Sequence, residues 1–115
     1  MNIPLDAVEI TPFQRRVYEA VLQIAHGRVT TYKWLGLSIG CGSPRAIGQA
    51  LRRNPLAPEV PCHRIVSSDA RIGGFAGETD GPEITKKLRL LAEEGVIFED
   101  GKLADSAQIY TFGLE

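Results

Sequence analysis

The sequence predicts a mainly α-helical fold: a small, winged-helix-like bundle that contains a helix-turn-helix and a short β-hairpin wing. Apolar residues recur at helical spacing in four segments, and glycine and proline separate those segments. In two further segments, turn-forming residues lie between short β-branched or apolar stretches, a pattern that is typical of β-hairpins. With 115 residues, 43% of them hydrophobic, the chain has the size of one domain with one core. We therefore expect a single domain over residues 1–115.

The first expected helix covers residues 11–26. Thr11 is a candidate N-cap, and Pro12 suits the first helical position because its fixed φ is already helical. The apolar residues that recur on one face are Phe13, Val17, Val21 and Ile24. Gly27 is expected to end this helix.

Two shorter helices follow. Thr31 can cap "YKWLGLSIG", which ends in a glycine turn at 40–42, and Ser43 can cap "SPRAIGQALRRN" with Pro44 at its start. The expected inner face of the latter helix comprises Ala46, Ile47, Ala50 and Leu51. Two short helices joined by a glycine turn, the second opening with Arg45, resemble a helix-turn-helix.

The second half of the chain mixes loops, hairpins and one helix. Three prolines in residues 54–61 exclude a continuous helix or a central strand. "HRIVSSDARIGGF" predicts a local hairpin or wing, and Asp100-Gly101 between apolar residues predicts a second hairpin. "PEITKKLRLLAEEG" predicts a fourth helix that ends at Gly95. Its expected inner residues are Ile84, Leu88, Leu91 and Ala92.

Composition excludes several classes of protein. A mean hydropathy of −0.06 and the lack of an apolar run of about 20 residues argue against a membrane protein. The N-terminus shows no signal peptide, and two cysteines without one fit a reducing compartment, so we expect a cytoplasmic protein. The net charge of −1 hides an asymmetry, because residues 28–71 carry seven basic and two acidic side chains. This basic segment is either a phosphate-binding surface or a chance cluster of solvated charges.

Cys62 and His63 are the residues most suited to chemistry. A thiol beside an imidazole is an activated nucleophile, a metal-ligand pair or a small buried cysteine next to an exposed histidine. In an extended strand the two side chains would point to opposite faces, so only a turn lets them cooperate. The spacing of the two cysteines and two histidines matches no zinc pattern, and we expect no metal.

Three segments in order carry a family resemblance: "VTTYKWLGLSIGCGSPRAIGQALRRNP", "VPCHRIVSSDARIGGFAG" and "KKLRLLAEEG". Together they resemble the DNA-binding and catalytic domain of the O6-alkylguanine-DNA alkyltransferases, over residues 13–95 or thereabouts. "PCHRIV" is the active-site motif of that family. The resemblance implies a protein without a diffusible cofactor that acts on double-stranded DNA containing alkylated guanine. Most relatives carry an additional N-terminal domain, which this chain is expected to lack.

By this resemblance, Cys62 is the alkyl acceptor and His63 is the base that takes its proton through a water molecule. Glu94 orients the imidazole, and only the match to "LLAEEG" selects it over its neighbour Glu93. This is the nucleophile, base and orienter arrangement of a triad. Tyr32 is expected to donate a proton to the guanine leaving group, and its ring is expected to contact DNA by crowding the phosphate that must rotate.

The resemblance also assigns residues to DNA and to the base pocket. Arg45 is expected to replace the extruded base in the stack, which suits a planar, permanently charged guanidinium. Small residues on the recognition helix allow close approach in the minor groove, and Ser68 is expected near the flipped base or a phosphate. The remaining assignments are Ala46 and Gly48 for the groove, Asn54 for bracing the turn, and Ile65, Phe75 and Ala76 for backbone contacts to guanine.

The chain departs from the family in three places. Phe75-Ala76 stands where the family commonly has Tyr-Ser, which removes a hydroxyl but leaves the backbone N–H of Ala76. The loop at residues 78–83 is longer than expected and borders the pocket. Residues 102–115 match no segment of the family.

Three functions fit these observations to different degrees. The first is a monomeric, single-turnover repair protein that transfers a methyl group from O6-methylguanine to Cys62. The second is an alkyltransferase-like protein that binds the flipped lesion and recruits excision-repair proteins without transfer, but such relatives characteristically replace the cysteine. The third is a helix-turn-helix regulator, which leaves the ordered "PCHRIV…LLAEEG" pattern unexplained.

Overall fold

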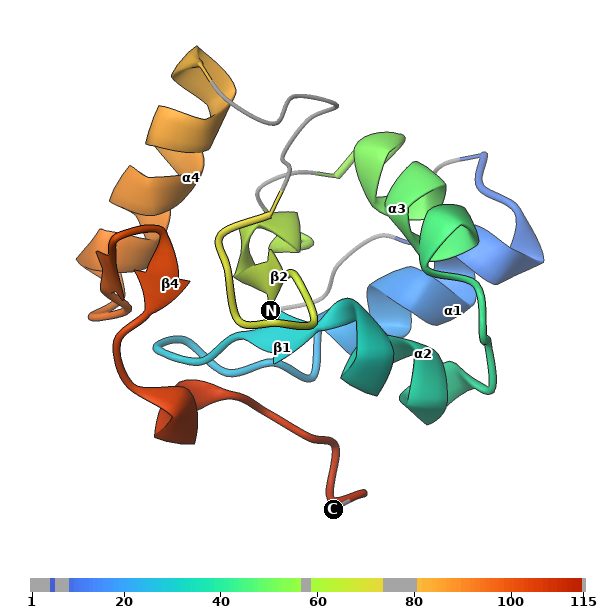
Figure 1. Cartoon of the computed structure of the whole chain (residues 1–115). Coiled ribbons are helices and arrows are strands. Elements are labelled where there is room, and N and C mark those ends of the chain that lie inside the picture. Colours follow the sequence, from blue (N-terminus) through green and yellow to red (C-terminus); the bar gives the residue numbers. More distant parts are fainter. Residues whose placement is uncertain (1–4, 6–8, 57–58, 74–80, 115) are drawn as a thin grey trace.

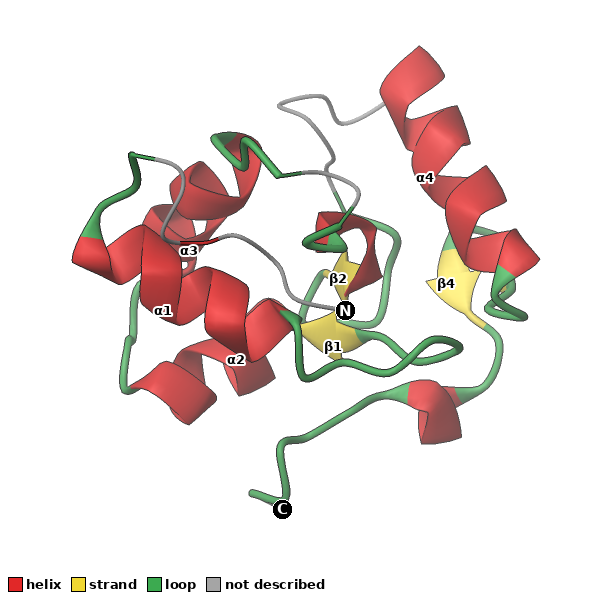
Figure 2. Cartoon of the chain, turned by 180° about the vertical axis from the view of Figure 1, so that it is seen from behind, coloured by secondary structure: helices red, strands yellow, loops and turns green. Residues whose placement is uncertain are grey.

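The computed structural model places three helices on one side of the molecule and a fourth on the other (Figures 1 and 2). It describes residues 5, 9–56, 59–73 and 81–114. The three neighbouring helices are α1 (Pro12–Val21), α2 (Tyr32–Ile39) and α3 (Pro44–Arg52), and the separate helix is α4 (Pro82–Glu93). Strands β1 (Thr30–Thr31) and β2 (Ile65–Val66) and a 3-10 helix, Cys62–Arg64, lie between these two groups (Figure 1). The structure therefore confirms the expected mainly helical fold.

The N-caps of the first three helices are confirmed. Thr11 forms a capping box with Gln14. Thr31 and Ser43 accept hydrogen bonds from the main-chain N–H groups three residues later, and Gly40 ends α2 in the left-handed conformation. Each cap satisfies an N–H that has no partner inside the helix, which explains why local sequence signals predicted these starts.

The first helix is shorter than predicted. α1 ends at Val21, and the chain continues in a tight turn in which Ile24 N–H donates to Val21 O. The side chain of Ile24 still reaches the core, with 1% of its surface exposed. Its carbonyl accepts a hydrogen bond from Arg64, a distant partner that the sequence pattern does not reveal.

Within the described residues 63–73, the segment predicted to form a local hairpin turns back on itself, but its strand pairs with a distant part of the chain. β2 (Ile65–Val66) pairs instead in parallel with β1 (Thr30–Thr31). After a turn closed by Ser67 N–H to Arg71 O, Arg71 forms an antiparallel bridge with Lys102. The reason is burial: Ile65 and Val66 are almost fully buried, and a strand buried on both faces pairs within the core instead of forming an exposed hairpin.

The second predicted hairpin is confirmed. β3 (Phe98–Glu99) and β4 (Lys102–Leu103) are antiparallel. Asp100 and Gly101 between them have φ values of 51° and 79°, as a type I′ turn requires.

The C-terminal segment completes the small sheet. After the 3-10 helix Ser106–Gln108, Ile109 forms a parallel bridge with Val29, on the chain entering β1. Tyr110 donates its main-chain N–H to Val29 O, and Thr30 Oγ1 donates to Tyr110 O at 2.7 Å. Residues beyond the family resemblance thus support the strand that leads into α2.

Two apolar clusters meet at the segment that follows Cys62. Ile65 belongs to the cluster of α1–α3, whereas Val66 belongs to the cluster that includes Leu91 of α4. The expected inner face of α4 needs correction, because Leu88 and Ala92 are exposed while Lys87 is buried. Among the described residues, no helix is long and apolar enough to cross a membrane.

Candidate active site

The Cys62–Arg64 segment turns rather than extends. Cys62 N–H donates to Val60 O and Arg64 N–H donates to Pro61 O, which closes a single 3-10 turn before β2. The main chain at Cys62 and His63 is therefore not an extended strand. This turn sends Cys62 toward the α1–α3 cluster and His63 toward the end of α4.

The Cys62 thiol packs against the apolar cluster of α1–α3 and contacts the polar side chain of Asn54. Asn54 Nδ2 donates to Cys62 Sγ at 3.0 Å. Burial raises the pKa of Cys62 to about 11, although the Asn54 hydrogen bond and the charge of Lys87 both act to lower it. The thiol is therefore protonated at neutral pH in the free protein.

Asn54 also holds the loop that carries the cysteine. Its Nδ2 donates to Val60 O at 2.9 Å, and its Oδ1 accepts from Leu56 N–H at 2.8 Å. One side chain thus fixes the chain before Cys62 and contacts the thiol itself.

His63 contacts Glu94 directly. His63 is 6% exposed, and its Nε2 lies 2.7 Å from Glu94 Oε2. Burial lowers the pKa of His63, opposed by the Glu94 carboxylate, so the ring is neutral near pH 7. Because an ionised carboxylate only accepts, we assign the proton to Nε2, which leaves Nδ1 with a free lone pair.

Arg64 holds the same carboxylate from the other side. Its Nε and Nη2 donate to the two oxygens of Glu94 at 2.8 and 3.1 Å, and its Nη1 donates to Ile24 O at 2.8 Å. Gly27 N–H adds a longer contact of 3.3 Å to Glu94 Oε1. Burial alone would raise the pKa of Glu94, but the hydrogen bonds from Arg64, His63 and Gly27 lower it to about 2.

The sequence did not reveal the role of Lys87, just as it did not reveal the contact of Arg64 with Glu94. Lys87 is 1% exposed, and its Nζ donates to Ile65 O at 2.7 Å and to Ile72 O at 2.5 Å. Its position three residues after Ile84 and four before Leu91 places it on the inner face of α4, and that spacing was the available signal. Arg64 lies two residues after the cysteine, but its partners are distant in sequence.

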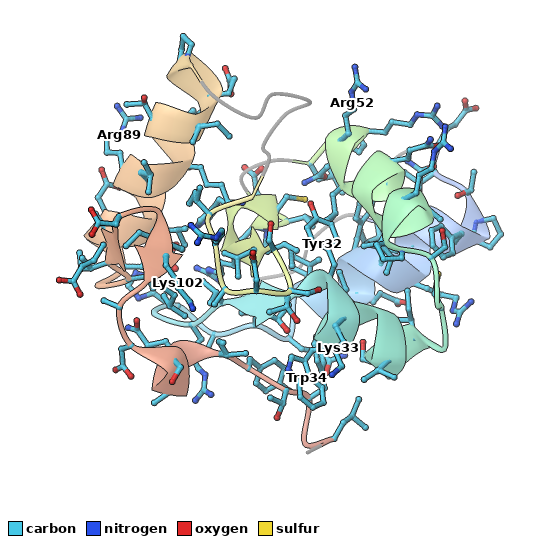
Figure 3. The ribbon with its side chains drawn as sticks, in the orientation of Figure 1. Tyr32, Lys33, Trp34, Arg52, Arg89 and Lys102 are labelled. Atoms are coloured by element: carbon cyan, nitrogen blue, oxygen red, sulfur yellow. The ribbon has the colours of Figure 1, made fainter. Side chains whose placement is uncertain are left out.

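Tyr32 and Gly48 face each other between α2 and α3. A methyl group added at Gly48 would lie 3.9 Å from the Tyr32 ring. Burial raises the pKa of Tyr32, and the charge of Cys62 adds to the effect, which places the phenol in the electrostatic range of the thiol. Tyr32 begins α2, and its side chain lies on the side of α2 that faces α3, away from Lys33 and Trp34 (Figure 3).

The remaining predicted residues lie at several places around this centre. Arg45 is exposed in the first turn of α3, Ala46 beside it is partly buried, and Ser68 is exposed in the turn after β2. The main chain of Ile65 is engaged within the protein, since its N–H donates to Cys62 O and its carbonyl accepts from Lys87. Phe75, Ala76 and residues 78–80 of the long loop lie outside the described residues.

A metal centre finds no support in the described residues, where no group of three or more His, Cys, Asp or Glu side chains is placed to hold an ion. The sulfur of Cys41, the other cysteine, makes polar contacts with the main-chain N–H and carbonyl of Ser43. The groups that the structure brings together at this site are a thiol, an imidazole and a carboxylate.

Comparison with known proteins identifies this arrangement. Residues 12–96 match the family model of the 6-O-methylguanine DNA methyltransferase DNA-binding domain. The chain belongs to the O6-alkylguanine-DNA alkyltransferase family. Its match begins and ends within one residue of the range expected from the sequence motifs, so the alkyltransferase domain includes α1 through α4.

Individual alkyltransferase relatives differ in what their names state. A DNA base-flipping protein of Thermus thermophilus is 40% identical over 97 residues, which cover 84% of this chain and 62% of that protein. A methylated-DNA–protein-cysteine methyltransferase of Methanosarcina barkeri is 42% identical over 83 residues, covering 71% and 52%. The chain thus spans only half to three fifths of the length of these curated relatives.

A solved structure of similar length also matches. S. pombe Atl1, in complex with damaged DNA containing O6-carboxymethylguanine, superposes with a TM-score of 0.72 at 28% identity. The match covers 90% of this chain and 98% of Atl1. It supports the mainly helical alkyltransferase fold with its small β elements.

Proposed function

We propose that this protein repairs DNA by flipping O6-alkylguanine, chiefly O6-methylguanine, out of the duplex and transferring the alkyl group irreversibly to Cys62. The observation that carries the proposal is a partly buried thiol in the same turn as a histidine that pairs with an ionised carboxylate. A base must leave the stack before a side chain can reach its O6 substituent. The reaction is a single turnover, because the thioether that forms is not hydrolysed.

The residues supply each part of a balanced displacement. The proton of Cys62 passes through a water molecule to His63 Nδ1, since no hydrogen bond joins these two side chains directly among the described residues. The sulfur then attacks the alkyl carbon, forming a carbon–sulfur bond as the carbon–O6 bond breaks. The departing guanine anion takes a proton from the Tyr32 phenol. Glu94 holds the imidazole in the required tautomer and stabilises its charged form.

The helix-turn-helix supplies the contacts to double-stranded DNA. Arg45, exposed at the start of α3, replaces the flipped base in the stack. Ala46 and Gly48 allow the backbone of α3 to approach the minor groove closely, and Ser68 contacts the flipped base or a phosphate. The basic segment at residues 28–71 provides phosphate contacts, so binding weakens as the salt concentration rises.

The proposal treats residues 1–115 as one domain that carries both DNA binding and transfer, acting as a monomer in the cytoplasm without a cofactor. Support comes from the match over residues 12–96, which includes every described member of the candidate active site. The C-terminal segment stabilises this domain through Ile109 and Tyr110.

A lesion-binding protein that recruits excision repair is the second candidate function. Two observations favour it: the similarity to Atl1 over nearly the whole of both chains, and the similarity to a relative named for base flipping alone. The presence of Cys62, His63 and Glu94 together favours transfer, because binding without transfer requires none of these three groups.

One experiment separates the two candidates. The protein is incubated with duplex DNA containing O6-methylguanine, and its peptides are mapped by mass. We expect the methyl group on Cys62, no methylation in Cys62→Ala, and unchanged methylation in the matched control Cys41→Ala. Tight binding of the duplex with Cys62 unmodified would contradict transfer and support the lesion-binding function.

A further inference from the structure

Glu94 is bonded to two neighbouring side chains of the Cys62–Arg64 turn. His63 Nε2 lies 2.7 Å from Glu94 Oε2, and Arg64 donates from Nε to Oε1 at 2.8 Å and from Nη2 to Oε2 at 3.1 Å. Both carboxylate oxygens therefore accept from the guanidinium, and one of them is shared with the imidazole. The exposed fractions of the His63, Arg64 and Glu94 side chains are 7, 15 and 9%, so water screens these charges little.

The turn after α1 fixes the guanidinium and the carboxylate. Arg64 Nη1 donates to Ile24 O at 2.8 Å, and Gly27 N–H contacts Glu94 Oε1 at 3.3 Å. The two groups thus contact the same stretch of main chain as well as each other. A planar fork with several donors can make all of these bonds at once, whereas a lysine ammonium offers a single charged point.

The charge of Glu94 creates a problem for a base next to it. A carboxylate within about 4–6 Å favours the charged form of an imidazole. Because an imidazolium carries protons on both nitrogens, its Nδ1 cannot accept a proton from a thiol. The positive charge of Arg64 cancels the negative charge of Glu94 as seen by His63, while the hydrogen bond from Nε2 to the carboxylate is kept.

The pKa of His63 agrees in direction with this charge balance. Burial lowers it, the Glu94 carboxylate raises it, and the charges of Arg64 and Lys87 lower it. The charged and titratable groups around the imidazole are Glu94 and Lys87 from α4 and its C-cap, and Cys62 and Arg64 from its own turn. Of the two cations, Arg64 is the one bonded to the carboxylate that His63 binds.

We propose that Arg64 is a positioning residue for the base: it holds the Glu94 carboxylate toward His63 and offsets its charge, so that the imidazole stays neutral and its Nδ1 accepts the proton of Cys62. The proton leaves Sγ through a water molecule for Nδ1, and the proton on Nε2 stays in its hydrogen bond to Glu94. The inference deepens the proposed function and rests on it for the role of His63 as the base.

The test follows the ring nitrogens of His63 by nitrogen-15 NMR in the protein without DNA. A His26→Gln background removes the other, exposed histidine. The chemical shifts report which nitrogen carries the proton and the pH at which the second proton leaves. Arg64→Met removes the guanidinium, and Arg64→Lys keeps the charge without the fork. Arg15→Met is the matched control, because Arg15 pairs with Glu19 at 3.6 Å in a more exposed ion pair on α1.

We expect a neutral His63 with its proton on Nε2 in the wild type at pH 7. Arg64→Met should raise the pH at which the second proton leaves by about one pH unit, because the carboxylate is no longer offset. Arg64→Lys should shift it less, and Arg15→Met should not shift it. A folded Arg64→Met protein whose His63 titrates as in the wild type would overturn the proposal, as would equal shifts in Arg64→Met and Arg64→Lys.

The same variants separate a positioning role from a purely structural one. In Arg64→Met, methyl transfer should be slower than in the wild type by up to about tenfold where His63 has become protonated. This deficit should shrink as the pH rises and the imidazole loses its second proton. A deficit that is the same at every pH would mean that Arg64 only supports the fold, and would overturn the proposal.

A further measurement uses the unaltered Arg64 in case Arg64→Met does not fold. The Nε–H of Arg64, which donates to Glu94 Oε1, should exchange slowly with water at pH 7. Slow exchange supports the proposal, and rapid exchange would show that the pair is open in solution and would overturn it. Failure of the proposed function would look different: no methylation from DNA, with the dependence of the His63 titration on Arg64 intact.

Discussion

Glu94 and Cys62 lie on two sides of the same turn and meet opposite environments. The Glu94 carboxylate accepts hydrogen bonds from Arg64, His63 and the main chain of Gly27, and its pKa is lowered to about 2. The Cys62 thiol receives one hydrogen bond from Asn54, and burial raises its pKa to about 11. The base side of the site is ionised and fixed, whereas the nucleophile side is neutral.

This difference means that Glu94 is ready for the reaction in the free protein, whereas Cys62 must first lose its proton. A carboxylate held by a bidentate arginine needs no rearrangement to orient His63. The site is therefore preorganised before the substrate binds. A protonated thiol in an apolar environment resists adventitious oxidation and alkylation, since the thiolate is the reactive form. A protein that reacts once benefits from a nucleophile that stays inactive until a flipped base is present.

The largest expected effect comes from removing the negative charge of Glu94. Glu94→Gln keeps the shape of the side chain but removes the charge that holds His63 and Arg64. We expect the single-turnover rate of methyl transfer to fall by at least about 100-fold, the scale of general-base catalysis. The free energy of unfolding, measured with urea, should fall by about 3 kcal/mol, because Arg64 is left partly buried without its partner.

Glu93→Gln is the matched control for this variant. Glu93 precedes Glu94 directly and is exposed, so its removal should change neither the rate nor the stability. Equal losses in the two variants would show that the helix end, rather than the carboxylate facing His63, matters for transfer.

The second effect is on stability in acid. The pKa of Glu94 is about 2 in the folded protein and near 4.5 when unperturbed, so the unfolded chain binds the extra proton as the pH falls. Its contribution is complete above about pH 5 and is lost between pH 5 and 2, amounting to about 2 to 3 kcal/mol. Urea titrations at several pH values should show this slope, and Glu94→Gln should flatten it. An equally steep slope in the variant would assign acid sensitivity to other groups.

The smallest effect is expected on the thiol side. In the wild type, the hydrogen bond from Asn54 to Cys62 Sγ acts to lower the pKa of the thiol. Asn54→Ala removes this bond and also the bond to Val60 O. We expect iodoacetamide to alkylate Cys62 about threefold more slowly, and stability to fall by about 1 to 2 kcal/mol. A faster reaction in Asn54→Ala would mean that the amide shields the thiol instead of activating it.

The sequence predicted what depends on neighbouring residues. Thr11, Thr31 and Ser43 cap helices through contacts three residues away, and Asp100-Gly101 forms a turn from its own φ values, so each signal is local. The pairing of β2 with β1 was missed because two-residue strands carry no register signal, and their parallel pairing joins residues 35 apart.

For the candidate site too, local sequence motifs were informative and contacts between distant residues were not. The family motif drew attention to Cys62, His63 and Glu94, and the structure places the last two 2.7 Å apart. The contacts of Arg64 and Lys87 were missed because both side chains have distant partners. Arg64 binds Glu94 and Ile24, and Lys87 binds Ile65 and Ile72. A charged residue spaced like the apolar residues of an inner helix face, as Lys87 is, therefore also predicts a buried side chain.

The central claim is that Cys62 accepts one alkyl group per protein molecule. The most direct test titrates a fixed amount of protein with an excess of duplex DNA containing O6-methylguanine and measures the repaired guanine that accumulates. We predict a plateau at one repaired guanine for each protein molecule, and none for Cys62→Ala. Saturated binding of the duplex without any loss of O6-methylguanine would contradict the claim.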